Sequence, residues 1–147
     1  MSESGVVTEV SSTVRRPGIS AAKVRELVEA TLEAERIGNA MISVAFVGSA
    51  AIAKLNKKYL RHSGPTDVIS FGMGRDAAGM PAIGDIYICP DVARRNARLL
   101  GISEREEIAR LVVHGALHVA GHDHPEDESR TRSKMWKRQE RILAGRD

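Results

Sequence analysis

The order of apolar and polar residues along the chain predicts an alternation of helices and strands. Apolar residues recur every three or four positions in three segments, as in helices with one buried face: residues 20–38, 49–60 and 90–101. Short apolar runs bounded by glycine, proline or polar residues are typical of strands: residues 41–47, 67–71 and 83–89. The polar residues 1–18 show neither pattern, so we expect a flexible or partly ordered N-terminal segment there.

A further helix is predicted to begin after Ser103, which opens the capping-box sequence "SERE", and to stop near Gly121. From Ile108 onward, apolar residues occupy almost its whole circumference, which is typical of a helix buried in the centre of a domain. This helix carries His114 and His118 into the interior. Buried imidazoles without a common partner would cost about 1–3 kcal/mol each, so the pair calls for a physical explanation.

The stretch "HGALHVAGHDH" at residues 114–124 predicts a metal site. His114 and His118 are four residues apart and share one helix face, and Gly121 can turn the chain back so that His124 approaches the same point. Three neutral imidazole ligands favour Zn²⁺, and a fourth position left for water is typical of a catalytic site rather than a structural one. Other late first-row metals also fit these ligands.

The same spacing resembles the H-x-x-x-H-x-x-G-x-x-H pattern of metzincin proteases, except at one position. Where those proteases have a glutamate as general base, this chain has Gly115, which we expect to leave the helix face open. A peptidase would need its base elsewhere, and no His-Glu pair occurs in the sequence.

Composition narrows the class of protein. The chain has 147 residues, 42% of them hydrophobic, so we expect residues 1–147 to form one domain with its own core. Cys89 is the only cysteine, and no apolar stretch approaches the ~20 residues that span a bilayer, so a cytoplasmic protein is the simplest interpretation. The net charge of +3 favours polyanionic partners, although basic clusters on helices are also common as ordinary solvated surfaces.

Three stretches in order, "LNKKYLRHSGPTDVISF", "IGDIYIC" and "HGALHVAGHDH", resemble the YbeY family of zinc endoribonucleases and rRNA maturation factors. The family signature is matched at His114, Gly115, Leu117, His118, Gly121, Asp123 and His124. The resemblance implies a zincin-like α+β fold, with a small mixed sheet packed against helices and a central buried metal-binding helix. It also implies one Zn²⁺ per chain, cleavage of single-stranded RNA in maturation of the 16S rRNA 3′ end, and ribosome quality control. Its partners would be rRNA, the small ribosomal subunit and ribosome-associated proteins.

Two positions depart from the family pattern. His122 stands where many members have tyrosine, and we interpret it as a neighbour of the site. Many members also follow the "LNxxY" motif directly with an arginine that meets substrate phosphate, whereas here Leu60 takes that place and Arg61 follows it. Arg61 can still serve if it lies in irregular backbone, because a continuing helix would turn it about 100° away.

These residues suggest a mechanism. A metal held by the three histidines would activate water for attack on the phosphodiester, and we expect His114, Arg61 and Asp123 to be catalytic residues. Arg61, Lys57 and Lys58 would neutralise the phosphate charge. Asp123 would orient a liganding histidine or act as a base. Alternatively, Asp123 would only stabilise the turn in which it lies. Two other functions stay open: a metal-dependent hydrolase of another substrate such as peptides, and a ribosome-assembly factor whose metal is structural.

Overall fold

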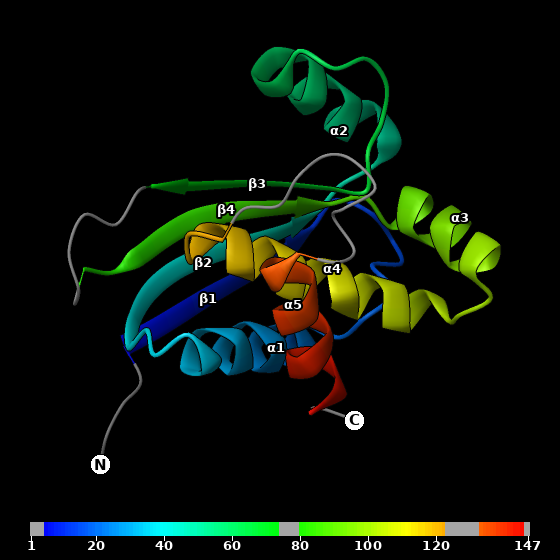
Figure 1. The fold of residues 1–147 in the computed structure, drawn as a ribbon. Coiled ribbons are helices and arrows are strands. Elements are labelled where there is room, and N and C mark those ends of the chain that lie inside the picture. Colours follow the sequence, from blue (N-terminus) through cyan, green and yellow to red (C-terminus); the bar gives the residue numbers. More distant parts are fainter. Residues whose placement is uncertain (1–4, 74–79, 123–132, 146–147) are drawn as a thin grey trace.

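The protein has the predicted α+β fold, with helices packed on a small mixed sheet (Figure 1). The structure is a computed structural model that describes residues 5–73, 80–122 and 133–145. The strands are β1 (Gly5–Ser12), β2 (Asn39–Phe46), β3 (Val68–Met73) and β4 (Ala82–Ile88). The helices are α1 (Ala21–Ala34), α2 (Ser49–Leu55), the π-helix η1 (Asn56–Leu60), α3 (Pro90–Leu100), α4 (Glu104–Val119) and α5 (Lys134–Ala144). Within the described ranges, no helix is long and apolar enough to cross a membrane.

The strand order in the sheet is β1-β2-β4-β3. β1, β2 and β4 run parallel, whereas β3 pairs antiparallel with β4. The mixed sheet therefore has a parallel strand at one edge and an antiparallel strand at the other. The three strands predicted from apolar runs are β2, β3 and β4, so these runs were interpreted correctly.

Within residues 1–18, where we expected a flexible or partly ordered segment, residues 5–12 form the strand β1. Val6, Thr8 and Val10 alternate with exposed residues and turn one half-buried face towards the helices. Such alternation is typical of an edge strand with one solvated face. The sequence prediction missed it because the polar residues dominate the segment, and because the partner strand β2 lies far along the chain.

Helices α1, α4 and α5 lie on one face of the sheet, and α2 lies on the other (Figure 1). Ile86 and Ile88 of β4 face the main core beneath the three helices. Tyr87 points to the opposite face, where it packs against a smaller apolar cluster that includes Ile52 of α2. The position of α4 between the sheet and the other helices explains why nearly its whole circumference is apolar.

The contact between α4 and the sheet is unusually close. A Cβ added to Gly115 would lie 2.7 Å from Cγ2 of Ile86 on β4. A Cβ added to Gly84 on β4 would lie 2.7 Å from Cγ2 of Val119, at the other end of the same helix surface. We expected from the sequence that Gly115 would leave the helix face open, and this expectation was wrong. It is buried against the sheet, and the missing side chain lets the helix approach.

The helix predicted at residues 49–60 is divided in two. α2 ends at Leu55, and the next five residues form the π-helix η1, a form that often occurs at functional sites. Asn56 is buried at this junction, and its Nδ2 donates a hydrogen bond to the carbonyl oxygen of Gly64 at 2.9 Å. Tyr59 lies in η1 and is 53% exposed, although we expected the helix at residues 49–60 to bury one apolar face.

Candidate active site

Two histidines lie one turn apart on α4, as their spacing predicts. The ring centroids of His114 and His118 are 4.8 Å apart, and the ring planes meet at 78°. Both side chains are half-buried, although their neighbours in sequence on α4 are almost all buried. Two imidazoles at this separation form a donor set that suits a divalent transition metal such as Zn²⁺.

Helix α4 ends in a tight turn that redirects the chain beside these histidines. Gly121 has φ +110°, a conformation that favours glycine. Its N–H donates to the carbonyl oxygen of His118, and the N–H of His122 donates to that of Leu117, both at 2.9 Å. These two bonds make a Schellman motif, so the predicted reversal at Gly121 is present.

The rest of the predicted ligand set lies beyond this turn. His124, the third predicted ligand, and Asp123, the predicted catalytic carboxylate, lie outside the described residues. Within the residues that are described, no group of three histidine, cysteine, aspartate or glutamate side chains comes together in a way that could hold a metal. The structure therefore brings together His114 and His118 and leaves the third ligand a proposal.

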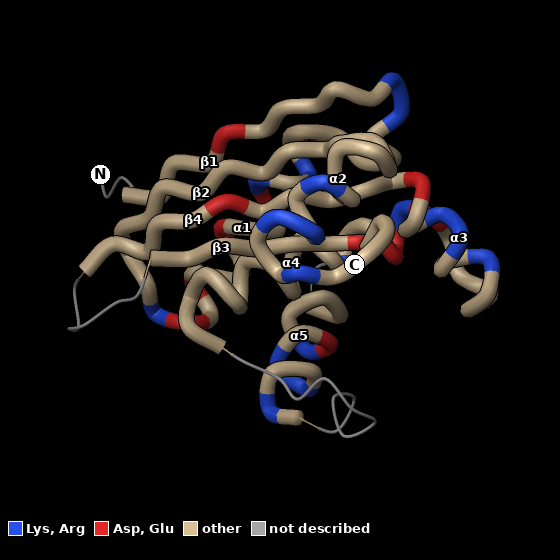
Figure 2. The backbone as a smooth tube through the Cα atoms, turned by 90° about the horizontal axis from the view of Figure 1, so that it is seen from above, with Lys and Arg blue, Asp and Glu red and all other residues tan. Residues whose placement is uncertain are grey.

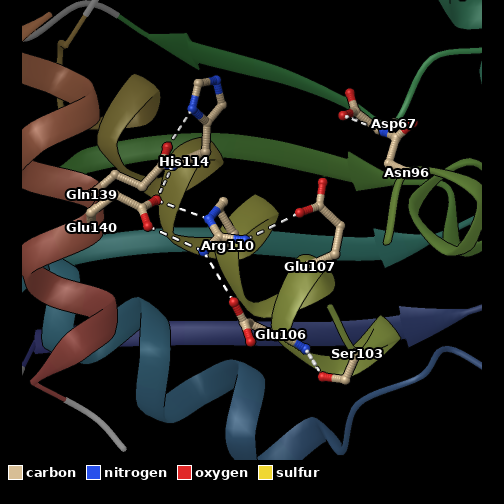
Figure 3. A network of polar contacts seen from close by, with 9 residues as sticks. All are labelled: Asp67, Asn96, Ser103, Glu106, Glu107, Arg110, His114, Gln139 and Glu140. Atoms are coloured by element: carbon tan, nitrogen blue, oxygen red, sulfur yellow. Dashed lines mark hydrogen bonds and ion pairs between the residues drawn. The ribbon is translucent and has the colours of Figure 1, made fainter. Parts of the chain in front are cut away.

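The ring of His114 is held from one side by Gln139 of α5. His114 Nδ1 lies 2.7 Å from Gln139 Oε1 (Figure 3). Gln139 is only 1% exposed, and its Nε2 donates to Glu140 Oε2 at 2.9 Å. The contact engages Nδ1, so Nε2 is the ring nitrogen that does not face Gln139. A histidine whose Nδ1 contacts a buried amide fits the role of a metal ligand.

Arg110 anchors the other end of this hydrogen-bonded chain. Its Nε and Nη2 donate to the two carboxylate oxygens of Glu140 at 2.9 and 3.1 Å (Figure 3). Arg110 also contacts Glu106 and Glu107, each at 3.3 Å. Burial alone would raise the pKa of Glu140, but hydrogen bonds from Arg110 and Gln139 outweigh it and lower that pKa below its usual value. Glu140 is therefore ionised at neutral pH.

A cleft of about 480 Å³ lies near the N-terminal half of α4, where Arg110 and Glu140 form part of its wall together with residues of α1 and α5. Neither histidine lines it. It therefore offers no support for a substrate site at the histidine pair.

His122 takes part in a separate cluster. Its Nε2 is hydrogen-bonded to Glu35 at the end of α1, and Arg138 Nε of α5 donates to the same carboxylate at 2.7 Å. Burial by itself would raise the pKa of Glu35, but its hydrogen bonds with His122 and Arg138 outweigh that effect, so the pKa lies below the usual value. His122 thus joins the end of α4 to α1 and α5.

The predicted phosphate-binding residues are all exposed on or just after η1. Lys57 and Lys58 lie within η1, and Arg61 follows it in a left-handed conformation with φ +58°. Arg61 is therefore in irregular backbone. This is the condition under which we expected Arg61 to reach the substrate phosphate. Figure 2 shows lysine and arginine along α2 and α3. The roles of Lys57, Lys58 and Arg61 in binding phosphate stay predictions.

Sequence reasoning did not identify Gln139 or Glu35. One signal for Gln139 was present: it lies four residues after Met135, which is buried, so it is a polar residue at an inward position of a helix. A buried amide needs hydrogen-bond partners. No such signal existed for Glu35, because its partners lie 87 and 103 residues away in the sequence.

Comparison with known proteins gives one consistent result. The family model described as Endoribonuclease YbeY matches residues 10–146. An Endoribonuclease YbeY of Aquifex aeolicus is 42% identical over 102 residues, which is 69% of this chain and 68% of that protein. One from Kineococcus radiotolerans is 34% identical over 95% of this chain and 84% of that protein. A solution structure from Thermotoga maritima matches with a TM-score of 0.62 and 26% identity, over 93% of this chain and 87% of that one.

Proposed function

We propose that this chain, which belongs to the endoribonuclease YbeY family and is therefore an RNA-cleaving hydrolase, works with a divalent metal ion held by His114, His118 and His124. The observation that carries the proposal is the histidine pair on α4, with ring centroids 4.8 Å apart. The contact between His114 Nδ1 and Gln139 supports it further, because histidine ligands of metals usually donate their other ring N–H to a polar neighbour.

Zn²⁺ is the metal we propose, one ion per chain, because three neutral imidazoles are a typical catalytic zinc set. When bound, such an ion supplies a Lewis acid that activates water at neutral pH and polarises the phosphodiester. The chain itself contributes orientation. The close packing of α4 on β4 holds the backbone beneath His114, and the Schellman turn at Gly121 ends α4 one turn after His118.

The basic residues around η1 are proposed to bind the RNA backbone. Lys57, Lys58 and Arg61 are exposed and lie within five consecutive positions, so they place several positive charges on one short surface segment. Contacts to phosphate provide affinity without base specificity. Arg61 is proposed to neutralise charge on the scissile phosphate, and Asp123 to orient a liganding histidine or accept a proton.

The proposed substrate is single-stranded rRNA of the small subunit. We propose maturation of the 16S rRNA 3′ end and ribosome quality control as the biological role, in the cytoplasm, with the small ribosomal subunit and its associated proteins as partners. The family membership and the net charge of +3 support this assignment.

The experiment that tests the metal site compares His114→Ala and His118→Ala with His122→Asn. Metal content per chain, measured by elemental analysis, and cleavage of a single-stranded rRNA fragment are the two readouts. We expect both alanine variants to lose bound metal and cleavage together. His122→Asn is the matched control, because His122 is hydrogen-bonded to Glu35 in the described structure. One metal per chain retained in His114→Ala would contradict the ligand assignment.

A metal with a purely structural role would give a different result. In that case, each ligand variant would lose melting temperature and activity in proportion. With a catalytic metal, we expect variants that remain folded at the assay temperature and yet have no measurable cleavage.

A further inference from the structure

Gln139 is a buried polar side chain with two different neighbours. It is 1% exposed, and its amide lies between the ring of His114 on α4 and the carboxylate of Glu140 on its own helix. Figure 3 shows the chain of contacts running from His114 through Gln139 and Glu140 to Arg110. An apolar residue of similar size would fill this interior position without needing any partner, so the amide calls for an explanation.

The direction of the amide follows from the charge of Glu140. An ionised carboxylate only accepts hydrogen bonds. Glu140 is ionised because Arg110 donates to both of its oxygens, at 2.9 and 3.1 Å, and its pKa is lowered. The NH₂ group of Gln139 must therefore face Glu140, and its Nε2 lies 2.9 Å from Glu140 Oε2. The carbonyl oxygen of Gln139 must then face His114.

The amide direction in turn decides which nitrogen of His114 carries the proton. A carbonyl oxygen only accepts, so the 2.7 Å contact requires a proton on Nδ1 of His114. A neutral imidazole with its proton on Nδ1 has its lone pair on Nε2. In Figure 3, this second nitrogen points away from Gln139.

We propose that Gln139 is a positioning residue that fixes the Nδ1–H tautomer of His114, with Arg110 and Glu140 setting the direction of its amide. The ring is thereby prepared to give Nε2 to a divalent metal before any ion arrives. The inference rests on the proposed function for its purpose, since the ligand of Nε2 is the proposed metal. The tautomer itself is a property of the metal-free protein.

Arg110 makes this arrangement rigid. It contacts Glu106 and Glu107 on its own helix as well as Glu140 on α5, so three carboxylates hold one guanidinium. Burial raises the pKa of Glu107, against the lowering effect of its contact with Arg110. The cluster therefore spans α4 and α5 and keeps the Glu140 carboxylate within hydrogen-bond distance of the Gln139 amide.

The first measurement needs no variant. Protein labelled with ¹⁵N-histidine and stripped of metal is studied at pH 8 by long-range ¹H–¹⁵N correlation, which distinguishes the two neutral tautomers of each ring. We expect His114 to be protonated at Nδ1. A signal from the Nε2–H tautomer of His114 in the wild-type protein would overturn the proposal.

The second measurement uses two substitutions that differ in one property. Gln139→Met keeps the size and removes the acceptor, whereas Gln139→Glu keeps an oxygen that can accept from Nδ1. We expect Gln139→Met to shift His114 to a mixture of tautomers and to weaken Zn²⁺ binding about 10- to 100-fold. Gln139→Glu should retain the Nδ1–H tautomer and bind Zn²⁺ within a few-fold of wild type, even if its melting temperature falls.

The outcomes separate this inference from the proposed function. If Gln139→Met keeps both the tautomer and the Zn²⁺ affinity of wild type, Gln139 does not position the ring, while the metal site stands. If the tautomer responds as expected but wild-type protein binds no Zn²⁺, the role of Gln139 is upheld and the metal proposal fails. If both variants lose the tautomer in proportion to their melting temperatures, Gln139 only stabilises the fold and the inference is overturned.

Discussion

Gly115 on α4 faces Ile86 on β4 so closely that a Cβ at position 115 would lie 2.7 Å from the Cγ2 atom of Ile86. This places the residue that follows His114 against the sheet. The same position carries the general-base glutamate in metzincin proteases. Here a side chain at that position would force Ile86 to shift, so the close packing disfavours a glutamate there. This relationship favours RNA cleavage over the peptidase alternative.

Replacing Gly115 with alanine should destabilise the protein by about 1–3 kcal/mol, because overpacking a close contact forces backbone or side chains to shift. Denaturant unfolding measures the change. Gly145→Ala is the matched control: a Cβ there would lie no closer than 3.6 Å to its nearest neighbour, so its effect should be small. Equal stability of the two variants would contradict the close packing of α4 on β4.

The turn at Gly121 gives a second prediction. With φ at +110°, an alanine there would be strained by about 1–2 kcal/mol. Gly121→Ala should also weaken Zn²⁺ binding, because the turn leads from His118 towards His124. The control is Gly38→Ala, at a glycine without positive φ and with nothing within 4 Å of an added Cβ. Isothermal titration with Zn²⁺ and thermal unfolding give the two readouts.

The contacts of Glu35 predict a pH dependence. Its folded-state pKa is lowered, so its ionised form stabilises the fold above the ordinary value of 4.5. This contribution is lost as pH falls through the lowered folded-state pKa. Glu35→Gln should therefore destabilise the protein by about 1–3 kcal/mol at pH 7, because it weakens the contacts with His122 and Arg138.

At acid pH, below the lowered pKa of Glu35, wild type and Glu35→Gln should converge in stability. Denaturant unfolding at pH 7, 5 and 3 measures the difference between them. A difference that stays constant across this range would show that the charge of Glu35 contributes nothing.

Arg61 provides a prediction about the substrate. Arg61→Ala should reduce kcat for a single-stranded rRNA fragment about 100-fold or more if it stabilises charge in the transition state. It should also lower the salt dependence of RNA binding by about 0.7 in the slope of log K against log salt concentration. Arg25→Ala, on the exposed side of α1, removes the same charge on the other layer of the molecule and is the control. Equal effects of the two substitutions would reduce Arg61 to a general electrostatic role.

Local sequence signals determined much of the fold. The Ser103 cap is present, with its Oγ accepting from the N–H of Glu106 at 3.0 Å, because capping depends only on neighbouring residues. The shared face of His114 and His118 follows from helix geometry alone. The reversal at Gly121 also follows from local conformational freedom.

Other features depend on residues distant in the sequence, and only the tertiary structure decided them. β1 is a strand because β2, more than 30 residues away, supplies its hydrogen bonds. The role of Gly115 depends on Ile86, and the orientation of His114 depends on Gln139, 25 residues further on. The sequence by itself therefore specified which residues carry the chemistry and the local turns that present them. Packing between distant segments decided how the ring of His114 is oriented and how closely α4 approaches the sheet. Such contacts depend on burial and shape complementarity, which no short stretch of sequence encodes.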